Sequence, residues 1–243
     1  MGFPTGSYGP SEKIFTESAT QKAPLGTRLV LRDGRVFRYV KNGGVALVVG
    51  NVLSKAVAGA DHIKDLVVAA IVAVGGTTVT VTNGATTAIT ANMFRDGYLY
   101  MNDAAGEAHV YTIKSHNAAA TGAVVTIQLY DWCPVQVALA ATSECGLCKS
   151  MYDGVIQAAV AVTAPVVGVA IKALTISYYG WIQTWGPASV LTVGNVLIGA
   201  PVSLITTAGC AGPTAAVTTP PVGVVMAVAA ATEHSLIFLT IAP

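Results

Sequence analysis

The sequence predicts an all-β protein made of β-barrel or β-sandwich units, with an extended N-terminal arm and at most one or two short helices. Two observations predict this class. Val, Ile and Thr, which suit a pleated and half-buried surface, are dense throughout the 243 residues. Asp-Gly and Asn-Gly pairs, which favour the tight turns of β-hairpins, recur between the apolar runs, at 33–34, 42–43, 83–84, 96–97 and 153–154.

Individual elements follow from the same signals. Residues 28–41 predict a hairpin with a two-residue turn at Asp33-Gly34, and residues 77–90 predict another that turns at Asn83-Gly84. Residues 97–113 predict a third hairpin around a polar turn at 103–107. The one plausible helix is 61–74, with Asp61 as its N-cap, although its valines weaken the prediction.

Charge is distributed unevenly along the chain. Charged residues make up 10% of the sequence and apolar residues 53%, and from Ala173 to Pro243 the only charged side chain is Glu233. Gly, Pro, Asn and Thr interrupt each apolar run before it could form a membrane-spanning helix, so we expect no membrane partner. Obligate subunit interfaces are depleted of charge at their centres, so this stretch predicts a β domain shared between subunits.

The chain is expected to have three parts: an arm at 1–27, a first β domain at 28–140 and a charge-poor second β domain at 141–243. The arm is rich in Gly, Pro, Ser and Thr and lacks an apolar pattern, so it is either disordered or ordered on a partner. Residues 1–64 hold nine Lys or Arg and four Asp or Glu, a net charge of +5. Without a recognition motif this bias is a weak nucleic-acid footprint, and no direct nucleic-acid binding is expected.

Two pairs of similar segments within the chain predict repeated strands. Residues 35–53 align with 179–197 at an offset of 144, and both segments contain Gly-Asn-Val-Leu. Residues 167–184 also resemble 222–240. Similar composition alone is the alternative explanation, because short apolar matches arise easily in a chain of this kind.

No catalytic motif appears in the sequence, so no enzymatic activity and no cofactor are expected. Glu107 and His109 stand beside a turn, where polar surface residues are common. Cys145 and Cys148 have the spacing of a redox pair or half a zinc site, but no second pair completes a zinc site. Free cysteines, a disulfide and a metal site therefore stay open for these two and for Cys133 and Cys210.

Four stretches carry a family resemblance, namely APLGTRLVLRDGRVFRYVKNGG (23–44), RDGYLYMNDAAGEAHVYTIKSH (95–116), YYGWIQTWGPASVL (178–191) and EHSLIFLTI (233–241). In this order they resemble virion structural proteins of tailed bacteriophages, of the capsid decoration or cement type. The resemblance implies a non-enzymatic protein made in the host cytoplasm. Such a protein sits on the outer face of the capsid, commonly as a trimer, and reinforces contacts between major capsid protein subunits.

Two groups of contact residues are expected. A two-residue turn at 33–34 would place one group on a single face of its hairpin and set Arg32 against Arg35, which calls for anionic partners such as capsid carboxylates. The other group lies on a strand that Gly186-Pro187 would end, with both faces apolar, as suits a subunit contact. The candidate capsid contacts are Arg28, Arg32, Arg35, Phe37 and Tyr39, and the candidate subunit contacts are Tyr179, Trp181 and Trp185.

Two other functions remain open from the sequence. A phage tail, fibre or baseplate component would share the trimeric state and the strand-rich sequence. A carbohydrate-binding β-sandwich would use Trp181 and Trp185 as a platform for sugar rings.

Overall fold

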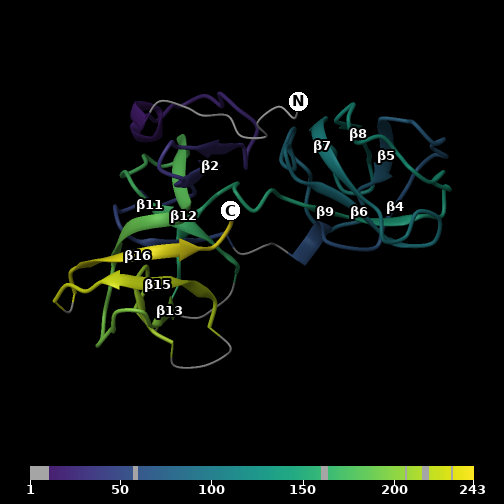
Figure 1. Cartoon of the computed structure of the whole chain (residues 1–243). Helices are drawn as coiled ribbons and strands as arrows, with labels where there is room; N and C mark the ends of the chain where they lie inside the picture. Colours follow the sequence, from purple (N-terminus) through teal and green to yellow (C-terminus); the bar gives the residue numbers. More distant parts are fainter. Residues whose placement is uncertain (1–10, 57–59, 160–163, 206, 215–218, 231) are drawn as a thin grey trace, which may run out of the picture. The chain divides into compact units, whose positions relative to one another are not determined.

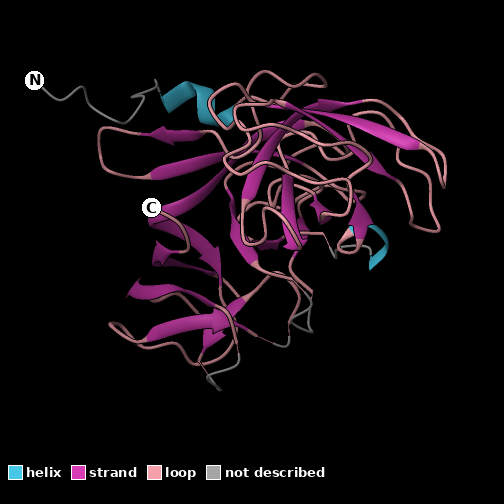
Figure 2. Ribbon diagram, turned by 90° about the vertical axis from the view of Figure 1, so that its right-hand side faces the viewer, coloured by secondary structure: helices cyan, strands magenta, loops and turns pink. Residues whose placement is uncertain are grey.

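The structure, a computed structural model, describes residues 11–56, 60–159, 164–205, 207–214, 219–230 and 232–243. Strands dominate its regular structure, and the helices within these ranges are two short 3-10 turns, η1 (Ser11–Phe15) and η2 (Ala60–His62) (Figure 2). The all-β prediction is confirmed. Unit 1 comprises residues 1–57 and 151–243, and unit 2 comprises residues 58–150 (Figure 1).

This division differs from the expected one, because unit 2 is an insertion within unit 1. The expected boundary between residues 140 and 141 falls inside unit 2. The reason is the pairing of strand β9 (Glu144–Cys148), which lies between β4 (Leu66–Val67) and β6 (Tyr98–Asp103) in the sheet of unit 2. A charge-poor composition therefore did not mark the start of a folding unit.

Unit 2 is a closed antiparallel barrel. Its sheet has the order β4-β9-β6-β7-β8-β5, and the two ends meet because Val68 bridges Val81 and the Ala69 N–H donates to the Thr80 carbonyl at 2.8 Å. Closure leaves no free sheet edge. Alternating inward residues such as Leu99, Ile113 and Ile127 fill the barrel. Its remaining strands are β5 (Thr78–Thr82), β7 (Val110–His116) and β8 (Val124–Leu129).

Two local predictions in unit 2 are wrong and one is confirmed. Residues 61–74 form η2 and β4 instead of a long helix, and the Asp61 carboxylate accepts the Thr86 hydroxyl at 2.8 Å instead of capping a helix. Residues 77–90 form no hairpin, since β5 pairs with β8 and the Asn83 amide donates to the Thr87 carbonyl at 3.0 Å within a loop. The 97–113 hairpin is present as β6 and β7.

Unit 1 holds a ten-stranded antiparallel sheet. Its order is β10-β3-β11-β12-β16-β15-β13-β14, and β2 pairs with β12 and with β1. The first group of strands is β1 (Arg28–Val30), β2 (Val36–Lys41), β3 (Val52–Ser54), β10 (Ile156–Gln157), β11 (Val166–Ala170) and β12 (Tyr179–Leu191). The second group is β13 (Pro201–Leu204), β14 (Ala211–Pro213), β15 (Pro221–Ala227) and β16 (His234–Thr240).

The sheet of unit 1 is an internal repeat that shares one strand. In the first repeat the spatial order is β10-β3-β11-β12-β2, and in the second it is β14-β13-β15-β16-β12, with the same chain order in both. The long strand β12 is thus the last strand of the first repeat and the first strand of the second. Unit 2 interrupts the first repeat between β3 and β10.

Hydrogen bonds and bulges repeat as well. A bulge skips Val167 where β11 pairs with β3, and a bulge skips Val222 where β15 pairs with β13. The Gly50 N–H donates to the Ala170 carbonyl at 2.7 Å, and the Gly199 N–H donates to the Val225 carbonyl at 2.9 Å. These matches fix the correspondence between the two repeats residue by residue.

The similarity between residues 167–184 and 222–240 therefore reflects a true structural repeat. The similarity between residues 35–53 and 179–197 was aligned in the wrong register. Val169 pairs with Gln183, and Val224, which stands 55 positions after Val169, pairs with Phe238, 55 after Gln183. For β2 and the second half of β12 the structural offset is 150: Lys41 pairs with Tyr179 as Leu191 pairs with His234. The identical Gly-Asn-Val-Leu letters misled the alignment, because Gly50 corresponds to Gly199 and not to Gly194.

Residues 11–27, the described part of the expected arm, pack on their own unit. Ile14 is 2% exposed and packs with Leu29, Leu31 and Phe37. Ser18 exchanges backbone hydrogen bonds with Tyr179 at 3.0 and 2.8 Å. This segment consequently covers the outer face of the first repeat.

Candidate functional site

The hairpin formed by β1 and β2 does not present the five candidate capsid contacts together. Leu29 lies opposite Phe37, and the Leu31 N–H donates to the Arg35 carbonyl at 2.9 Å. The turn thus holds three residues instead of two, which shifts the register by one and takes Arg32 away from Arg35. Arg35 instead binds Asp33, with 2.7 Å between Nε and Oδ2.

The five candidate capsid contacts also differ in how exposed they are to solvent. Phe37 is fully buried and Tyr39 is 4% exposed, so neither can contact another protein through its ring. Arg35 is half-buried beside Asp33. Arg28 and Arg32 are exposed and are the two members of the group that stay accessible.

The three candidate subunit contacts lie on the same face of β12, and each is half-buried. Tyr179 stacks with Tyr39 at 6.1 Å between ring centroids, and Trp181 meets the edge of Tyr39 at 5.1 Å. The N-terminal segment contacts this cluster, since the Lys22 N–H donates to the Tyr39 hydroxyl at 3.1 Å. Trp185 lies further along the strand and meets Phe238 edge to face at 5.7 Å.

Strand β12 does not end at Gly186-Pro187 as expected. It continues to Leu191, and Pro187 pairs with Phe238 of β16. On its other side β12 pairs with β2 up to Trp185, where β2 ends at Val36. A proline is tolerated there because the strand is paired on one side.

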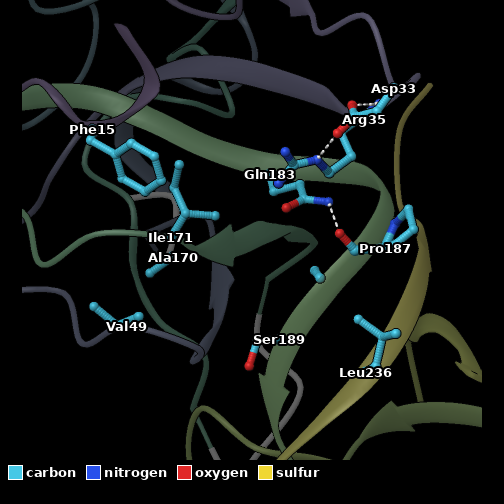
Figure 3. A pocket seen from close by; sticks show the side chains of 11 residues that line it. Phe15, Asp33, Arg35, Val49, Ala170, Ile171, Gln183, Pro187, Ser189 and Leu236 are labelled. Carbon is cyan, nitrogen blue, oxygen red and sulfur yellow. Dashed lines mark hydrogen bonds and ion pairs between the residues drawn. The ribbon is translucent and has the colours of Figure 1, made fainter. Parts of the chain in front are cut away.

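A groove lies along this one-sided part of β12. It has a volume of about 470 Å³, and its walls come from η1, the 33–35 turn, β11, β12 and β16 (Figure 3). Phe15 is 54% exposed, Val49 49% and Leu236 40%, so the groove is bordered by solvent-exposed apolar side chains. The residues that line it are Phe15, Asp33, Arg35, Val49, Ala170, Ile171, Gln183, Pro187, Ala188, Ser189 and Leu236.

Gln183 stabilises the floor of the groove. Its side chain is 1% exposed, and its Nε2 donates to the carbonyls of Pro187 at 2.8 Å and Trp185 at 3.1 Å (Figure 3). Pro187 lies where β12 has run past the end of β2, so at this residue the buried amide takes the place of the missing strand. Sequence alternation indicates only the face of a strand on which a side chain lies, and it does not indicate that an amide will bind the backbone of its own strand.

One ion pair, between Asp33 and Arg35, lies at the rim of the groove, and another, between Glu17 and Lys172, involves the N-terminal segment. Burial alone would raise the pKa of Asp33, but hydrogen bonds from the Arg35 N–H and guanidinium outweigh it and lower that pKa. The pKa of Glu17 is lowered chiefly by the Thr175 N–H at 3.0 Å and also by Lys172 at 3.2 Å. Glu17 thereby fixes the N-terminal segment to the loop after β11.

The outer face of the second repeat is bare beside this groove. The side chains of Val224, Leu236 and Met226 are 38%, 40% and 44% exposed, and Phe238 and Trp185 are half-buried among them. None of these side chains is charged. Within the described residues, no segment covers this face as residues 11–27 cover the first repeat. The sequence signal for it was the charge-poor stretch, which did not show which side chains point outward.

The cysteine pair does not form a site. On β9, Cys145 and Cys148 stand three residues apart, so alternation directs them to opposite sides of the strand. Cys145 is fully buried in the barrel, and no disulfide joins any of the four cysteines. Across the described ranges, no group of three or more His, Cys, Asp or Glu side chains could hold a metal ion.

His109 and Glu107 likewise form no acid–base pair. The His109 Nδ1 lies 3.0 Å from the Gly106 carbonyl and 3.1 Å from the Glu107 backbone carbonyl. The contacts at this turn are thus between the imidazole and the backbone.

Comparison with models of protein families, with curated proteins and with solved structures found no match. Of the helices in the described part of the chain, none has the length and apolar character needed to cross a membrane.

Proposed function

We propose that the chain is a virion structural protein, a capsid decoration or cement protein that binds the outer surface of the major capsid protein shell and stabilises it. The proposal makes it non-enzymatic and a homotrimer. The observation that carries it is the bare outer face of the second repeat. Exposed apolar patches of this kind mark sites of interaction with another protein.

The bare face is assigned to the contact between copies of the chain. Val224, Met226 and Leu236 stand on neighbouring strands of one sheet and offer no charge that would have to be desolvated. Self-association through such a face removes apolar surface from water, which contributes roughly 25 cal/mol per Å² of buried apolar area. A face of this composition matches the uncharged centre of a homo-oligomer interface.

The capsid contact is assigned to Arg28 and Arg32 on the β1–β2 hairpin. Both side chains are exposed, and in the described structure neither forms an ion pair. Arginine binds carboxylates through paired hydrogen bonds, so acidic groups on the capsid surface are suitable partners. Such a contact is screened by salt.

The proposal is tested by sedimenting the purified protein with phage heads that lack it. We expect the protein to sediment with the heads, and an Arg28→Ala/Arg32→Ala variant to bind several-fold more weakly at low salt. Arg95→Ala is the matched control, because Arg95 is an exposed arginine of unit 2. No sedimentation with heads, but binding to tails, would replace the proposal with the tail, fibre or baseplate alternative.

Carbohydrate binding is a second candidate, which one observation favours. Trp132 is 71% exposed and stacks on Tyr130 at 5.6 Å between centroids, as a sugar-binding platform would. Trp181 and Trp185, the platform expected from the sequence, are half-buried by their own chain. Retardation on polysaccharide gels that is lost in Trp132→Ala would establish this candidate.

A further inference from the structure

The groove along β12 contains a backbone position that no other residue binds. Ser189 lines the groove, and its side chain is exposed (Figure 3). Two residues further on, the Leu191 N–H points away from β16 and donates to the Gly50 carbonyl at 2.8 Å. Alternate residues of an antiparallel strand direct their N–H and C=O groups to the same side, so those of Ser189 also point away from β16. In the described part of the chain, no hydrogen bond reaches either group.

The corresponding position of the first repeat is occupied by a tight turn. Tyr39 stands 150 residues before Ser189, which is the structural offset between β2 and the second half of β12. The Tyr39 N–H donates to the Thr27 carbonyl at 3.0 Å, and its own carbonyl accepts the Gly26 N–H at 2.8 Å. The Thr27 N–H closes the turn by donating to the Pro24 carbonyl at 3.2 Å. Gly26 has a φ of 84°, as the third position of a type II turn requires.

Four other turns with glycine in third position bind a single residue in the same way. In each, the glycine N–H donates to the carbonyl of that residue, whose N–H donates to the carbonyl of the fourth turn position. The five glycines have φ values between 77° and 84°. The turns and the residues that they bind are 24–27 with Tyr39, 48–51 with Ala170, 73–76 with Val135, 120–123 with Asn83 and 197–200 with Val225.

Two more turns show the same hydrogen bonds with a different residue in third position. Asp96 binds Ile113 and Ala108 binds Met101, and both Asp96 and Ala108 have a positive φ. What the arrangement requires is therefore a tight turn with a positive φ at its third position, where glycine is the least strained residue. Ser189 presents the same pair of backbone groups without such a turn.

The groove has room for a turn and not for a longer strand. Pro187 has no N–H, and its carbonyl already accepts Gln183 at 2.8 Å. Next to it, a Cβ on Gly186 would lie 3.2 Å from the Arg35 Cγ, so the 33–35 turn covers the strand there. A ligand consequently finds two backbone hydrogen bonds, both at Ser189, which is the number that one turn supplies.

The walls of the groove favour an uncharged turn. The exposed side chains of Phe15, Val49 and Leu236 border it, and each is apolar. Its charged lining residues, Asp33 and Arg35, already bind each other at 2.7 Å. An aliphatic residue at the second position of the turn would bury apolar surface against these walls, whereas a charged one would find no unpaired opposite charge among the lining residues.

We propose that this groove binds an uncharged type II turn of a partner protein through the backbone of Ser189. The third residue of that turn has a positive φ and is most readily glycine. Its N–H donates to the Ser189 carbonyl, and the Ser189 N–H donates to the carbonyl of the fourth residue. The contact is separate from the exposed arginines of the β1–β2 hairpin. It would also protect the free edge of β12 against pairing with a strand of another molecule.

A peptide with the sequence of residues 23–27, Ala-Pro-Leu-Gly-Thr with blocked ends, is a suitable probe. We expect it to shift the NMR signal of the Ser189 amide in the full chain, with saturation below about 10 mM, because so small a ligand binds weakly. The matched control has N-methylglycine in place of glycine, which removes only the N–H that reaches the Ser189 carbonyl. It should bind about fivefold more weakly, the effect of one lost hydrogen bond.

Three outcomes would overturn the proposal. A Ser189 signal that the peptide does not shift would show that the groove accepts no turn. Equal binding of the N-methylglycine peptide would reduce the contact to apolar burial. Slow hydrogen exchange of the Ser189 amide before any peptide is added would show that the groove is already filled, by a second copy where the protection falls on dilution and by the same chain where it does not. The amide of Ile237, which pairs with Ala188, reports whether the sheet itself is intact.

Discussion

His116 is a buried residue whose protonation opposes folding. It is 6% exposed; its Nε2 accepts the Phe94 N–H at 2.9 Å and its Nδ1 donates to the Asn117 carbonyl at 2.8 Å. Burial is the main cause that lowers its pKa below 6.5, and the bond to Asn117 opposes this effect only in part. A second proton on the imidazole would face the Phe94 N–H, which has no lone pair to accept it.

The pKa shift predicts acid sensitivity of unit 2. The unfolded chain takes up the proton at a higher pH than the folded one, so the free energy of unfolding is unaffected above about pH 6.5 and falls as the pH drops below it. His116→Gln cannot titrate, and its urea midpoint should change less between pH 7.5 and pH 5 than that of the wild type. At pH 7.5 the variant should itself be less stable by about 1–3 kcal/mol, since glutamine has no donor at the position of Nδ1 and the Asn117 carbonyl loses its hydrogen bond. His234→Gln, at an exposed position, is the control, and equal pH dependence in all three proteins would contradict the account.

Cys145 is predicted to be chemically inert in the folded chain. Burial raises the pKa of its thiol to about 12, so the reactive thiolate is scarce at neutral pH. A thiol reagent should modify the half-buried Cys133 in the native protein and reach Cys145 only after unfolding. Mass spectrometry of the modified peptides checks this. Modification of Cys145 at the rate of Cys133 would show that the barrel opens on the time scale of the reaction.

Among the elements, the repeated bulge gives the sharpest prediction. A Cβ on Gly168 would lie 2.7 Å from the Gln183 carbonyl, and a Cβ on Gly223 would meet the corresponding carbonyl of Phe238. Gly168→Ala and Gly223→Ala should each lower the free energy of unfolding by about 1–3 kcal/mol, because a backbone carbonyl must move. Gly44→Ala is the matched control in unit 1, since no atom lies within 4 Å of its Cβ. Equal stability of the three variants in urea unfolding would refute the equivalence of the two bulges.

At this scale the sequence predicts strands better than it predicts their partners. The alternation of β6 and β7 around a polar turn placed both strands correctly, because the two are neighbours in the chain and in the barrel. Asn83-Gly84 misled the prediction, because β5 finds its partner in β8, which is remote in sequence. In the β1–β2 hairpin a one-residue error in turn length changed which residues face outward. Register depends on such contacts, which composition and period do not contain.

For the whole molecule, the bare face of the second repeat predicts self-association. Val224→Glu/Met226→Glu places two carboxylates on this face and should convert the homo-oligomer into monomers without unfolding them, since both side chains are exposed in the single chain. Light scattering at micromolar concentration measures the mass. Val110→Glu, at a 57% exposed valine of unit 2, should leave the oligomer unchanged. A wild-type protein that is monomeric under these conditions would contradict the interface.

The charge-poor stretch contains this face but did not single it out. It indicated that residues 173–243 contain a subunit contact, but it pointed to Tyr179 and Trp181, which Tyr39 and the N-terminal segment contact in the same chain. The sequence did not reveal that residues 11–27 cover the first repeat, because no periodic pattern marks Ile14 as a buried residue. The insertion of unit 2 was hidden for a similar reason, since its ends carry no change in composition.

In the proposed function, this chain decorates the outer surface of a capsid. An electron cryomicroscopy map of intact, DNA-filled phage heads that contain the protein tests it most directly. We expect density for unit 1 on the outside of the major capsid protein shell, in groups of three copies that meet through the face containing Val224, Met226 and Leu236. Density for the chain in the tail alone, or heads whose outer surface shows none, would contradict it.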